Sequence, residues 1–540
     1  MAVKVPVQWN GMYMGSMSEQ QANLLMQVRE SECIPNLKNM LFDFPPELVL
    51  KSLQECKSIR SIVKRDNIDY TQYQSKLRDY QTVGTAFMYL SPRCVLADGC
   101  GLGKTAEVSG LINWLKFKGE LTRFLIAVET SALGQTQCEI MRFTGLNVIA
   151  MPSEAPKVRK VIEQTDWNSV DGIVIKHSTL RSDAFSKWLA LNIDKDGKCK
   201  VFNTFFLDES SVIKNDNTKT YTYTRNICNI VDRVHFMNAT TFETSILDIY
   251  NQLDMMNEAL LPKKWRIENE YCKYSRTSYW TKVNGTAQMN WRRERSGYKN
   301  QEQFKNSLKL VYFGRSAKDI GEDLPHIYKV YEVTPTNDMC VALTKGYRYN
   351  ELLNCPSLIP DAKIPMNRKN VPKLDRLCDL VENEFSGSKI MVYCFHIEAQ
   401  RVIAEELEKI GRKTVILNGA CDDEQRFEAQ QGFNGDKYDV IITNIKKSLN
   451  LHGGDVCIFY SMETNPSKSF QIASRIDRHT DDRIKTFVLM LYEGTDEYKY
   501  FTTTVKQRAK DARDLTIDAK TTVDFFFESM IESETEQLNN

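Results

Sequence analysis

The segment LADGCGLGKT, residues 96–105, joins a short apolar run to a stretch with helical periodicity. Gly101 and Gly103 can adopt positive φ, so that backbone N–H groups point inward as an anion-binding nest. Lys104 can reach the β- and γ-phosphates of a nucleotide, and the Thr105 hydroxyl can bind Mg²⁺. The start of the following helix adds the positive end of its dipole. The segment therefore favours a nucleotide-binding strand, loop and helix.

The strict phosphate-loop pattern G-x-x-x-x-G-K-[ST] is broken here, because Asp98 occupies the position of the first glycine. A glycine-rich, left-handed turn that binds no ligand is the alternative on this segment alone. The rest of the chain has to decide between the two interpretations.

Short apolar runs recur in two separate blocks of the chain, flanked by turn residues or helical patterns. Runs of β-branched and aromatic residues that alternate with helices are typical of parallel sheets covered on both faces. The sequence therefore predicts an α/β fold with two such sheets in succession. The runs are CVLA (94–97), FLIAV (124–128), GIVIK (172–176), VFNTFFLDE (201–209) and VHFMNAT (234–240), then KIMVYCF (389–395), KTVILNG (413–419), DVIITN (439–444), DVCIFYS (455–461) and KTFVLML (485–491).

Between the two blocks, the chain loses this rhythm and becomes rich in aromatic and basic residues, which favours a helical insert or hinge. The acidic end of the chain is typical of a short helix followed by a disordered tail. We expect an N-terminal accessory region (1–75), a nucleotide-binding first lobe (76–256), the helical insert (257–340), a second lobe (341–500) and a C-terminal helix with an acidic tail (501–540).

The composition is that of an ordinary globular protein, with 42% hydrophobic and 26% charged residues. At 540 residues, two or three domains are expected. The net charge of +1 argues neither for nor against a polyanionic partner. The 14 cysteines form no C-x-x-C pair, which favours free thiols in a reducing compartment over a zinc module. No apolar run approaches the ~18 residues of a membrane span, so a cytoplasmic location is expected.

A second element of a nucleotide-hydrolysing site ends the run FFLDE, residues 205–209. Asp208 would hold Mg²⁺ directly or through water, and Glu209 would orient and deprotonate the attacking water. Solvated acids at the end of a strand are the alternative. A glycine loop followed by this pair, in a chain of alternating strands and helices, favours the catalytic interpretation.

Two arginines, Arg475 and Arg478, lie three residues apart in QIASRIDR (471–478) and would share one face of a helix. Phosphoryl transfer needs cationic groups where negative charge develops, and a second surface can supply them. On its own, this pattern is more typical of a solvent-exposed helix face.

Together and in this order, these elements resemble the superfamily 2 helicase-like ATPases, and more narrowly the Swi/Snf family of DNA translocases, over about residues 76–500. An acidic residue at the Asp98 position is usual in the phosphate loop of that family. Other segments resemble further family motifs: LRDYQ (77–81) the adenine-side motif, NATTFETSILDIYNQLDMM (238–256) the coupling motif, YFGRSAKDIGEDLP (312–325) the link to the second lobe, TNIKKSLNL (443–451) the fifth motif and QIASRIDRHTDD (471–482) the arginine-finger motif.

The resemblance implies two tandem RecA-like domains that bind ATP and Mg²⁺, with nucleic acid as the partner. Thr443, in the fifth motif, is the implied nucleic-acid contact of the second lobe. The implied roles in the ATP site are nucleotide binding for Gln81, Gly101, Gly103, Lys104, Thr105 and Asp208, metal binding for Thr105 and Asp208, and catalysis for Lys104, Glu209, Arg475 and Arg478.

The insert gives independent support for a nucleic-acid partner. Between Lys263 and Lys318 there are 14 basic and 4 acidic residues, interleaved with tryptophans and tyrosines. Such a mixture suits phosphate contacts and the stacking of unpaired bases. A hinge that buries its aromatic side chains and leaves its lysines solvated is the alternative. The candidate contacts are Lys263, Lys264, Arg292, Arg293 and Arg295.

The main expectation is an ATP-driven translocase on double-stranded or forked DNA that acts in replication-fork, recombination or repair work of a bacterial or phage-infected cell. Two alternatives stay open: an ATPase whose main partner is RNA polymerase, and a helicase that separates strands of DNA or RNA. Stimulation of the ATPase by duplex DNA favours the translocase, stimulation by single strands favours the helicase, and a co-purifying polymerase favours the remaining alternative.

Overall fold

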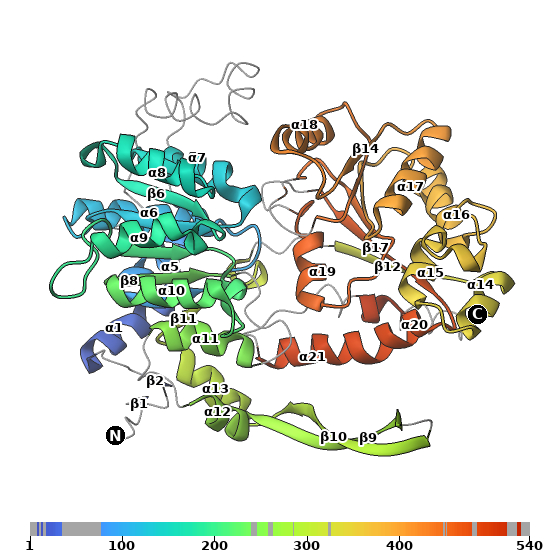
Figure 1. Cartoon of the computed structure of the whole chain (residues 1–540), viewed down its shortest axis with the longest axis horizontal. Helices are drawn as coiled ribbons and strands as arrows, with labels where there is room; N and C mark the ends of the chain where they lie inside the picture. Colours follow the sequence, from blue (N-terminus) through green and yellow to red (C-terminus); the bar gives the residue numbers. More distant parts are fainter. Residues whose placement is uncertain are drawn as a thin grey trace. The chain divides into compact units, whose positions relative to one another are not determined.

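The computed structural model describes residues 8–9, 12–13, 18–34, 77–238, 246–256, 263–283, 286–321, 326–445, 449, 451–477, 483–515 and 526–530. The chain divides into two compact units, the first made mainly of Met1–Gly99 and Gly103–Ser316 and the second mainly of Ala317–Arg513. Figure 1 shows helices around a sheet in each unit, in blue to green for the first and yellow to red for the second.

The first unit contains a seven-stranded sheet, and every neighbouring pair of its strands runs parallel. Parallel strands need crossover connections, and helices supply them here. In sheet order the strands are β11 (Tyr312–Phe313), β3 (Arg93–Leu96), β8 (Arg233–Met237), β7 (Thr204–Leu207), β4 (Phe124–Val128), β6 (Gly172–Lys176) and β5 (Val148–Met151).

Both faces of this sheet are buried. In β4, Phe124 and Ile126 belong to one apolar cluster, and Leu125 and Ala127 belong to the other, as the two-residue period of a strand requires. The first cluster includes α1 (Glu19–Arg29), α5 (Asp79–Leu90), α6 (Lys104–Phe117) and α7 (Leu133–Thr144). The second includes α8 (Ala155–Gln164), α9 (Asp183–Leu191), α10 (Lys219–Ile230) and α11 (Leu247–Met256).

The second unit repeats this architecture around a six-stranded parallel sheet. Its strands, in sheet order, are β12 (His326–Val333), β17 (Lys485–Tyr492), β16 (Val456–Phe459), β13 (Ile390–Tyr393), β15 (Val440–Thr443) and β14 (Thr414–Leu417). One face packs against α14 (Asn337–Thr344), α15 (Tyr349–Asn354), α16 (Pro372–Asp379) and α17 (Ile397–Lys409), and the other against α18 (Asp423–Asn434) and α19 (Pro466–Ala473).

The expected α/β fold with two tandem parallel sheets is therefore confirmed, and each of the ten predicted apolar runs overlaps a strand. Three strands of the two sheets, β5, β11 and β12, were not predicted. Two of them lie in the expected insert of 257–340: β11 belongs to the first sheet and β12 to the second. The two units divide after Ser316, inside the expected insert rather than at one of its ends.

The prediction that the insert is helical was wrong for its central part. β9 (Cys272–Val283) and β10 (Thr286–Tyr298) form a long antiparallel ribbon, preceded by α12 (Lys264–Tyr271) and followed by α13 (Gln301–Leu308) (Figure 1). The strand sequences CKYSRTSYWTKV and TAQMNWRRERSGY contain many aromatic and β-branched residues, which favour extended backbone.

The ends of the chain add to the two cores. From the expected accessory region, Leu25 of α1 is buried against the helices of the first unit. In the expected C-terminal region, α20 (Asp496–Tyr500), η10 (Phe501–Val505) and α21 (Lys506–Leu515) follow one another, and residues 526–530 are helical again. Phe526 and Phe527 pack into the second core. The acidic tail after residue 530 lies outside the described residues. Across the described segments, no helix combines the length and apolar character that crossing a membrane requires.

Candidate functional site

The predicted phosphate loop lies between β3 and α6. Gly101 has φ 84°, and Gly103, the N-cap residue of α6, has φ 84° and ψ 41°. A Cβ atom on Gly103 would lie 2.5 Å from Gln81 Nε2. Glycine meets both conditions, because side chains rarely adopt this φ and the space is already occupied. The loop therefore has the backbone shape for amide groups to surround an anion at the start of α6.

Lys104 and Gln81 both lie against this loop. Lys104 Nζ donates hydrogen bonds to the carbonyl oxygens of Asp98, at 2.7 Å, and Gly99, at 3.2 Å. Gln81 Oε1 accepts a hydrogen bond of 2.9 Å from Arg78 N at the start of α5, which fixes the amide next to the loop. The structure thus brings both residues to the predicted site, and their contact with a nucleotide stays a prediction.

Asp208 and Glu209 directly follow β7, as the sequence predicts. Asp208 N donates to Ala127 O at 2.9 Å, and Asp208 Oδ1 accepts a hydrogen bond of 3.0 Å from Glu209 N. Glu209 has φ 50° and ψ 53°, a left-handed conformation that costs a non-glycine residue roughly 1–3 kcal/mol. Residues held in this way cluster at functional sites. The bend turns the chain sharply out of the strand at the predicted catalytic glutamate.

The order of strands brings these two elements to one edge of the first sheet. β8 lies between β3 and β7, and Leu96 at the end of β3 pairs with Met237 at the end of β8. Neighbouring strands lie about 4.8 Å apart, so the ends of β3 and β7 are roughly 10 Å apart. The Thr105 hydroxyl and the Asp208 carboxylate are oxygen ligands of the kind that Mg²⁺ takes together with phosphate and water. The donor set fits Mg²⁺ bound to a nucleotide.

Ser210 links the catalytic turn to α11. Its hydroxyl donates a hydrogen bond of 2.7 Å to Gln252 Oε1, and both side chains are fully buried. Asn251 Nδ2, on the same helix, donates to Lys214 O at 2.7 Å. A displacement of the turn therefore reaches α11, part of the predicted coupling motif, through direct bonds. Residues 239–245 of that motif lie outside the described residues.

Arg475, in the second unit, has a side chain that bonds to its own lobe. It follows α19, and the residue is 9% exposed. Arg475 Nε donates to Gln471 O at 2.8 Å and Nη1 donates to Leu449 O at 3.3 Å. The guanidinium thus ties the arginine-finger motif to the fifth motif. Arg478 lies outside the described residues, and the catalytic roles of both arginines stay predictions.

Thr443, the predicted nucleic-acid contact of the second lobe, ends β15 and is fully buried. Its hydroxyl accepts a hydrogen bond of 3.0 Å from Ile445 N, and its carbonyl accepts one of 3.0 Å from Cys394 N. These bonds shape the loop after the strand. A direct contact of the Thr443 side chain with nucleic acid does not fit this burial.

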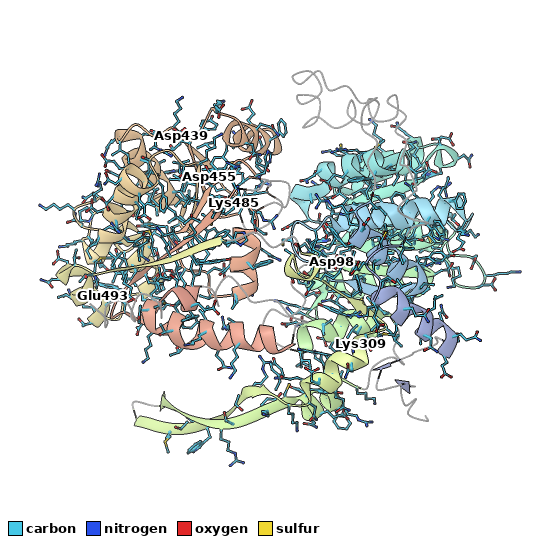
Figure 2. The ribbon with its side chains drawn as sticks, turned by 180° about the vertical axis from the view of Figure 1, so that it is seen from behind. Asp98, Lys309, Asp439, Asp455, Lys485 and Glu493 are labelled. Carbon is cyan, nitrogen blue, oxygen red and sulfur yellow. The ribbon has the colours of Figure 1, made fainter. Side chains whose placement is uncertain are left out.

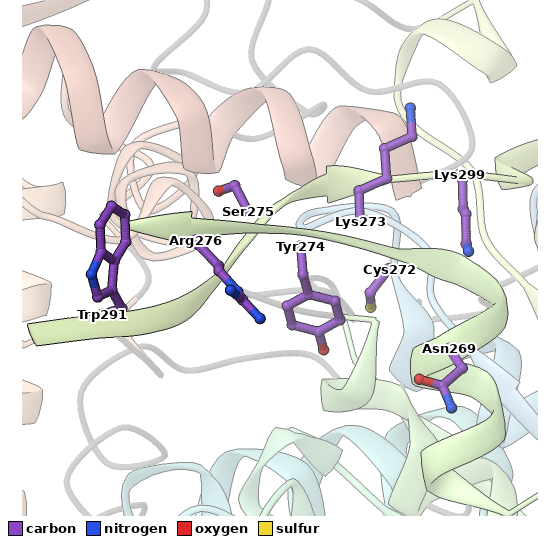
Figure 3. Close-up of a pocket in the computed structure, with 8 residues that line it drawn as sticks. All are labelled: Asn269, Cys272, Lys273, Tyr274, Ser275, Arg276, Trp291 and Lys299. Carbon is purple, nitrogen blue, oxygen red and sulfur yellow. The ribbon is translucent and has the colours of Figure 1, made fainter. Parts of the chain in front are cut away.

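The insert carries an open pocket of about 970 Å³ along β9 and β10 (Figure 3). Of the predicted contacts, Lys263 is exposed, Lys264 pairs with Asp216 at 3.4 Å, and the Arg295 guanidinium lies 5.1 Å from the centre of the Tyr298 ring. The strand β10 contains Arg292 and Arg293, whose side chains lie outside the described part. The pocket is lined by Asn269, Cys272, Lys273, Tyr274, Ser275, Arg276, Trp291 and Lys299.

One arginine of the insert, Arg315, is largely buried, whereas its basic neighbours in the sequence suggest an exposed surface. Arg315 is one of the 14 basic residues between Lys263 and Lys318, but its side chain is 13% exposed and lies between the carboxylates of Asp98 and Glu107. The sequence offered a signal for this arrangement, because an acid that directly follows a buried strand needs a partner. That signal does not say which of many basic residues is the partner.

Two family models match the chain. Residues 22–327 match the model described as "SNF2-related domain", and residues 372–480 match the "Helicase conserved C-terminal domain".

Among the curated relatives, the "Uncharacterized ATP-dependent helicase YqhH" of Bacillus subtilis is 24% identical over 184 residues, which are 34% of this chain and 29% of that protein. The "SWI/SNF-related matrix-associated actin-dependent regulator of chromatin subfamily A-like protein 1" of Xenopus laevis is 22% identical over 494 residues, covering 86% of this chain and 48% of that protein. The chain spans less than half the length of these relatives. Among solved structures, the "Sulfolobus solfataricus SWI2/SNF2 ATPase core in complex with dsDNA" is 17% identical with a TM-score of 0.39, covering 85% of this chain and 96% of that one.

Proposed function

Since this chain belongs to the SNF2-related family of ATP-hydrolysing, helicase-like enzymes, we propose that it uses ATP hydrolysis to move along double-stranded DNA. The observation that carries the proposal is the glycine loop at the end of β3, which shares one sheet edge with the Asp208-Glu209 turn after β7. The proposal includes work on replication forks, recombination intermediates or damaged DNA in a bacterial or phage-infected cell.

The residues of the first lobe divide the chemistry among them. Bound ATP with Mg²⁺ supplies a polarised γ-phosphate for attack by water. The loop amides and Lys104 hold the β- and γ-phosphates, while Thr105 and Asp208 hold the metal. Glu209 orients the attacking water and accepts its proton. Replacing Lys104 should therefore weaken both ATP binding and ATP hydrolysis, whereas replacing Glu209 should weaken hydrolysis alone.

The second lobe supplies positive charge in this proposal. Arg478 stabilises the charge that develops on the transferring phosphoryl group. Arg475, whose guanidinium bonds to the carbonyl oxygens of Gln471 and Leu449, supports the segment that carries Arg478. Hydrolysis is then coupled to movement of the lobes, because the arginines and the phosphate loop belong to different units.

The insert supports nucleic acid as the partner. Lys273, Arg276 and Lys299 are exposed along the ribbon, and Trp291 is 61% exposed beside them. Cationic side chains that pair with phosphates release counterions from a duplex, which gives affinity without sequence preference. The proposed phosphate contacts are Lys263, Lys264, Arg292, Arg293 and Arg295.

One observation favours strand separation as a second candidate function. Trp291 on β10 and Trp265 on α12 are 61% and 62% exposed, and Met289 on β10 is 49% exposed. Aromatic side chains stack on unpaired bases and contribute about 1–3 kcal/mol for each base. A ribbon with such side chains suits a place where duplex and single strands meet.

ATP hydrolysis measured with duplex DNA, single-stranded DNA, forked DNA and RNA tests the proposal. We expect duplex DNA to stimulate hydrolysis most and a triplex-displacement assay to report movement. Stimulation by single strands alone would refute duplex translocation and favour strand separation. Lys104→Ala should weaken nucleotide binding, Glu209→Gln should bind ATP with little turnover, and Glu154→Gln, an exposed glutamate on another loop, should change neither.

A further inference from the structure

Residues 312–315 run alongside β3 and the start of the phosphate loop, and Tyr312–Phe313 form an added strand there. Within β11, Tyr312 pairs with Val95 and Phe313 with Leu96, in parallel register with β3. The contact continues beyond the strand, because Gly99 N donates to Arg315 O at 2.8 Å. The segment that contains β11 and Arg315 therefore forms backbone hydrogen bonds along β3 and as far as Gly99 in the phosphate loop.

The Arg315 guanidinium joins three elements of the predicted ATP site. Its Nη2 lies 2.5 Å from Asp98 Oδ2, at the start of the phosphate loop, and 2.6 Å from Glu107 Oε1, on α6. Nη1 donates to Tyr80 O at 2.5 Å, in α5. Figure 2 labels Asp98 in the first unit. One side chain therefore bonds to the adenine-side motif, the phosphate loop and the helix that follows the loop.

The residues around Arg315, Asp98 and Glu107 accommodate this charged cluster. Both carboxylates are fully buried, and Asp98 Oδ1 also accepts a hydrogen bond of 3.0 Å from Arg315 N. A Cβ on Gly84 would lie 2.1 Å from Glu107 Oε1, so the glycine leaves the space that this carboxylate occupies. The Arg315 guanidinium also lies 4.6 Å from the centre of the Phe313 ring. Burial and the neighbouring Asp98 charge raise the pKa of Glu107 well above its usual range.

We propose that Arg315 is a positioning residue for ATP binding, which holds the phosphate loop through Asp98 and couples that loop to the link between the two lobes. Asp98 and Gly99 carry the carbonyl oxygens that hold Lys104 Nζ. If Arg315 is removed, a buried carboxylate loses its charged partner and the loop has to move to hydrate it. The chain enters the second unit directly after Ser316, so movement of the link acts on Arg315.

The test compares two arginines of the first unit. Arg123 donates hydrogen bonds to the carbonyl oxygens of Val170, Val201 and Trp167 and contacts no residue of the phosphate loop. Arg315→Gln and Arg123→Gln are compared by thermal unfolding, by the affinity for a fluorescent ATP analogue, and by KM and kcat for ATP without DNA. We expect both variants to unfold at lower temperature. Only Arg315→Gln should raise KM and weaken analogue binding, by tenfold or more.

Two further variants keep the test decisive if Arg315→Gln does not fold. Arg315→Lys keeps one positive charge but cannot reach both carboxylates and the Tyr80 carbonyl in fixed geometry, so its KM should lie between those of the wild type and Arg315→Gln. Arg315→Gln combined with Glu107→Gln removes one unpaired carboxylate. This double variant should regain stability but not ATP affinity. Loss of stability with an unchanged KM, in any folded variant that lacks Arg315, would overturn the positioning role.

The coupling part of this inference rests on the proposed function and has its own measurement. In Arg315→Lys at saturating ATP, we expect duplex DNA to stimulate kcat by less than half of the wild-type factor. Wild-type stimulation in this variant would overturn the coupling. If wild-type protein itself shows no stimulation by any nucleic acid, the proposed function fails. The effect of Arg315→Gln on KM without DNA still tests the positioning role in that case, because this measurement needs no nucleic acid.

Discussion

Replacement of Lys373 by methionine in the second lobe has an effect whose size follows from the structure. Lys373 Nζ lies 2.9 and 3.1 Å from the two carboxylate oxygens of Glu497 and 3.2 Å from Asn354 Oδ1, and both charged side chains are almost completely buried. Lys373→Met leaves the Glu497 carboxylate buried without its cation, which typically costs 3–5 kcal/mol. We expect a loss of about 3 kcal/mol, because Tyr492 N still donates to Glu497 at 3.0 Å.

Thermal unfolding of the full chain, followed by calorimetry, measures this effect. A loss of about 3 kcal/mol lowers the transition of a domain of roughly 150–250 residues by about 6–12 °C. The transition of the first lobe should stay in place, and ATP-analogue binding identifies that lobe because the ligand raises its transition. The comparison therefore assigns the loss to the lobe that contains Lys373.

The double variant Lys373→Met with Glu497→Gln is the control. The glutamine keeps an acceptor for Tyr492 N but carries no charge, so we expect it to recover most of the lost stability. A single variant destabilised by less than about 1 kcal/mol, or a double variant no more stable than the single one, would refute the reasoning about the buried pair.

Three further predictions concern the catalytic arginine, a buried acid and the insert. Arg478→Ala should keep ATP binding and lose DNA-stimulated hydrolysis by about a thousandfold or more, which nucleotide affinity and stimulated rate on one preparation can check. Burial and the Asp98 charge raise the pKa of Glu107, so the folded state binds a proton at this carboxyl group more readily than the unfolded chain does. The free energy of unfolding should therefore fall as pH rises between the two pKa values, and Glu107→Gln should flatten that dependence in denaturant titrations. Neutralising Arg292, Arg293 and Arg295 together should reduce the slope of log affinity for duplex DNA against log salt by up to about 2.7, and an unchanged slope would remove these residues from the DNA path.

The two sheets could be predicted from the sequence because their strands are short apolar runs buried on both faces. The strands that were missed lack that property. β12 reads HIYKVYEV, and most of its residues are only partly buried at the edge of the second sheet. β11 has two residues and is defined by its pairing with β3, more than 200 positions earlier in the chain. Pairing between distant segments leaves little local signal.

The ribbon of the insert was missed for a different reason. Its strands bear polar and charged residues at most positions, so neither the period of a strand nor that of a helix stands out. The sequence did contain a local signal between the two strands, Asn284-Gly285, which is typical of a two-residue hairpin turn. The prediction of helix rested on the loss of the strand pattern and on the basic and aromatic composition alone.

The ATP site could be predicted as far as its residues are close in sequence. The glycine loop and the Asp208-Glu209 turn are local patterns, and the sheet order brings them to one edge. The bonds of the loop to Arg315 join residues 217 positions apart. No periodicity or spacing selects that arginine from the 14 basic residues of the insert region, and three-dimensional structure alone identifies it.

The broken phosphate-loop pattern and the buried arginine are two parts of one arrangement. A glycine at the position of Asp98 would need no partner, whereas a carboxylate there has to be paired because it is fully buried. Arg315 meets this need with its guanidinium and its backbone N–H, and Gly84 leaves space for the second carboxylate of the cluster, that of Glu107. The acid in the loop thereby makes the geometry of the phosphate site depend on a residue next to the link between the lobes. Asp98, the residue that departs from the nucleotide-binding pattern, is therefore the point at which the second lobe can act on the first.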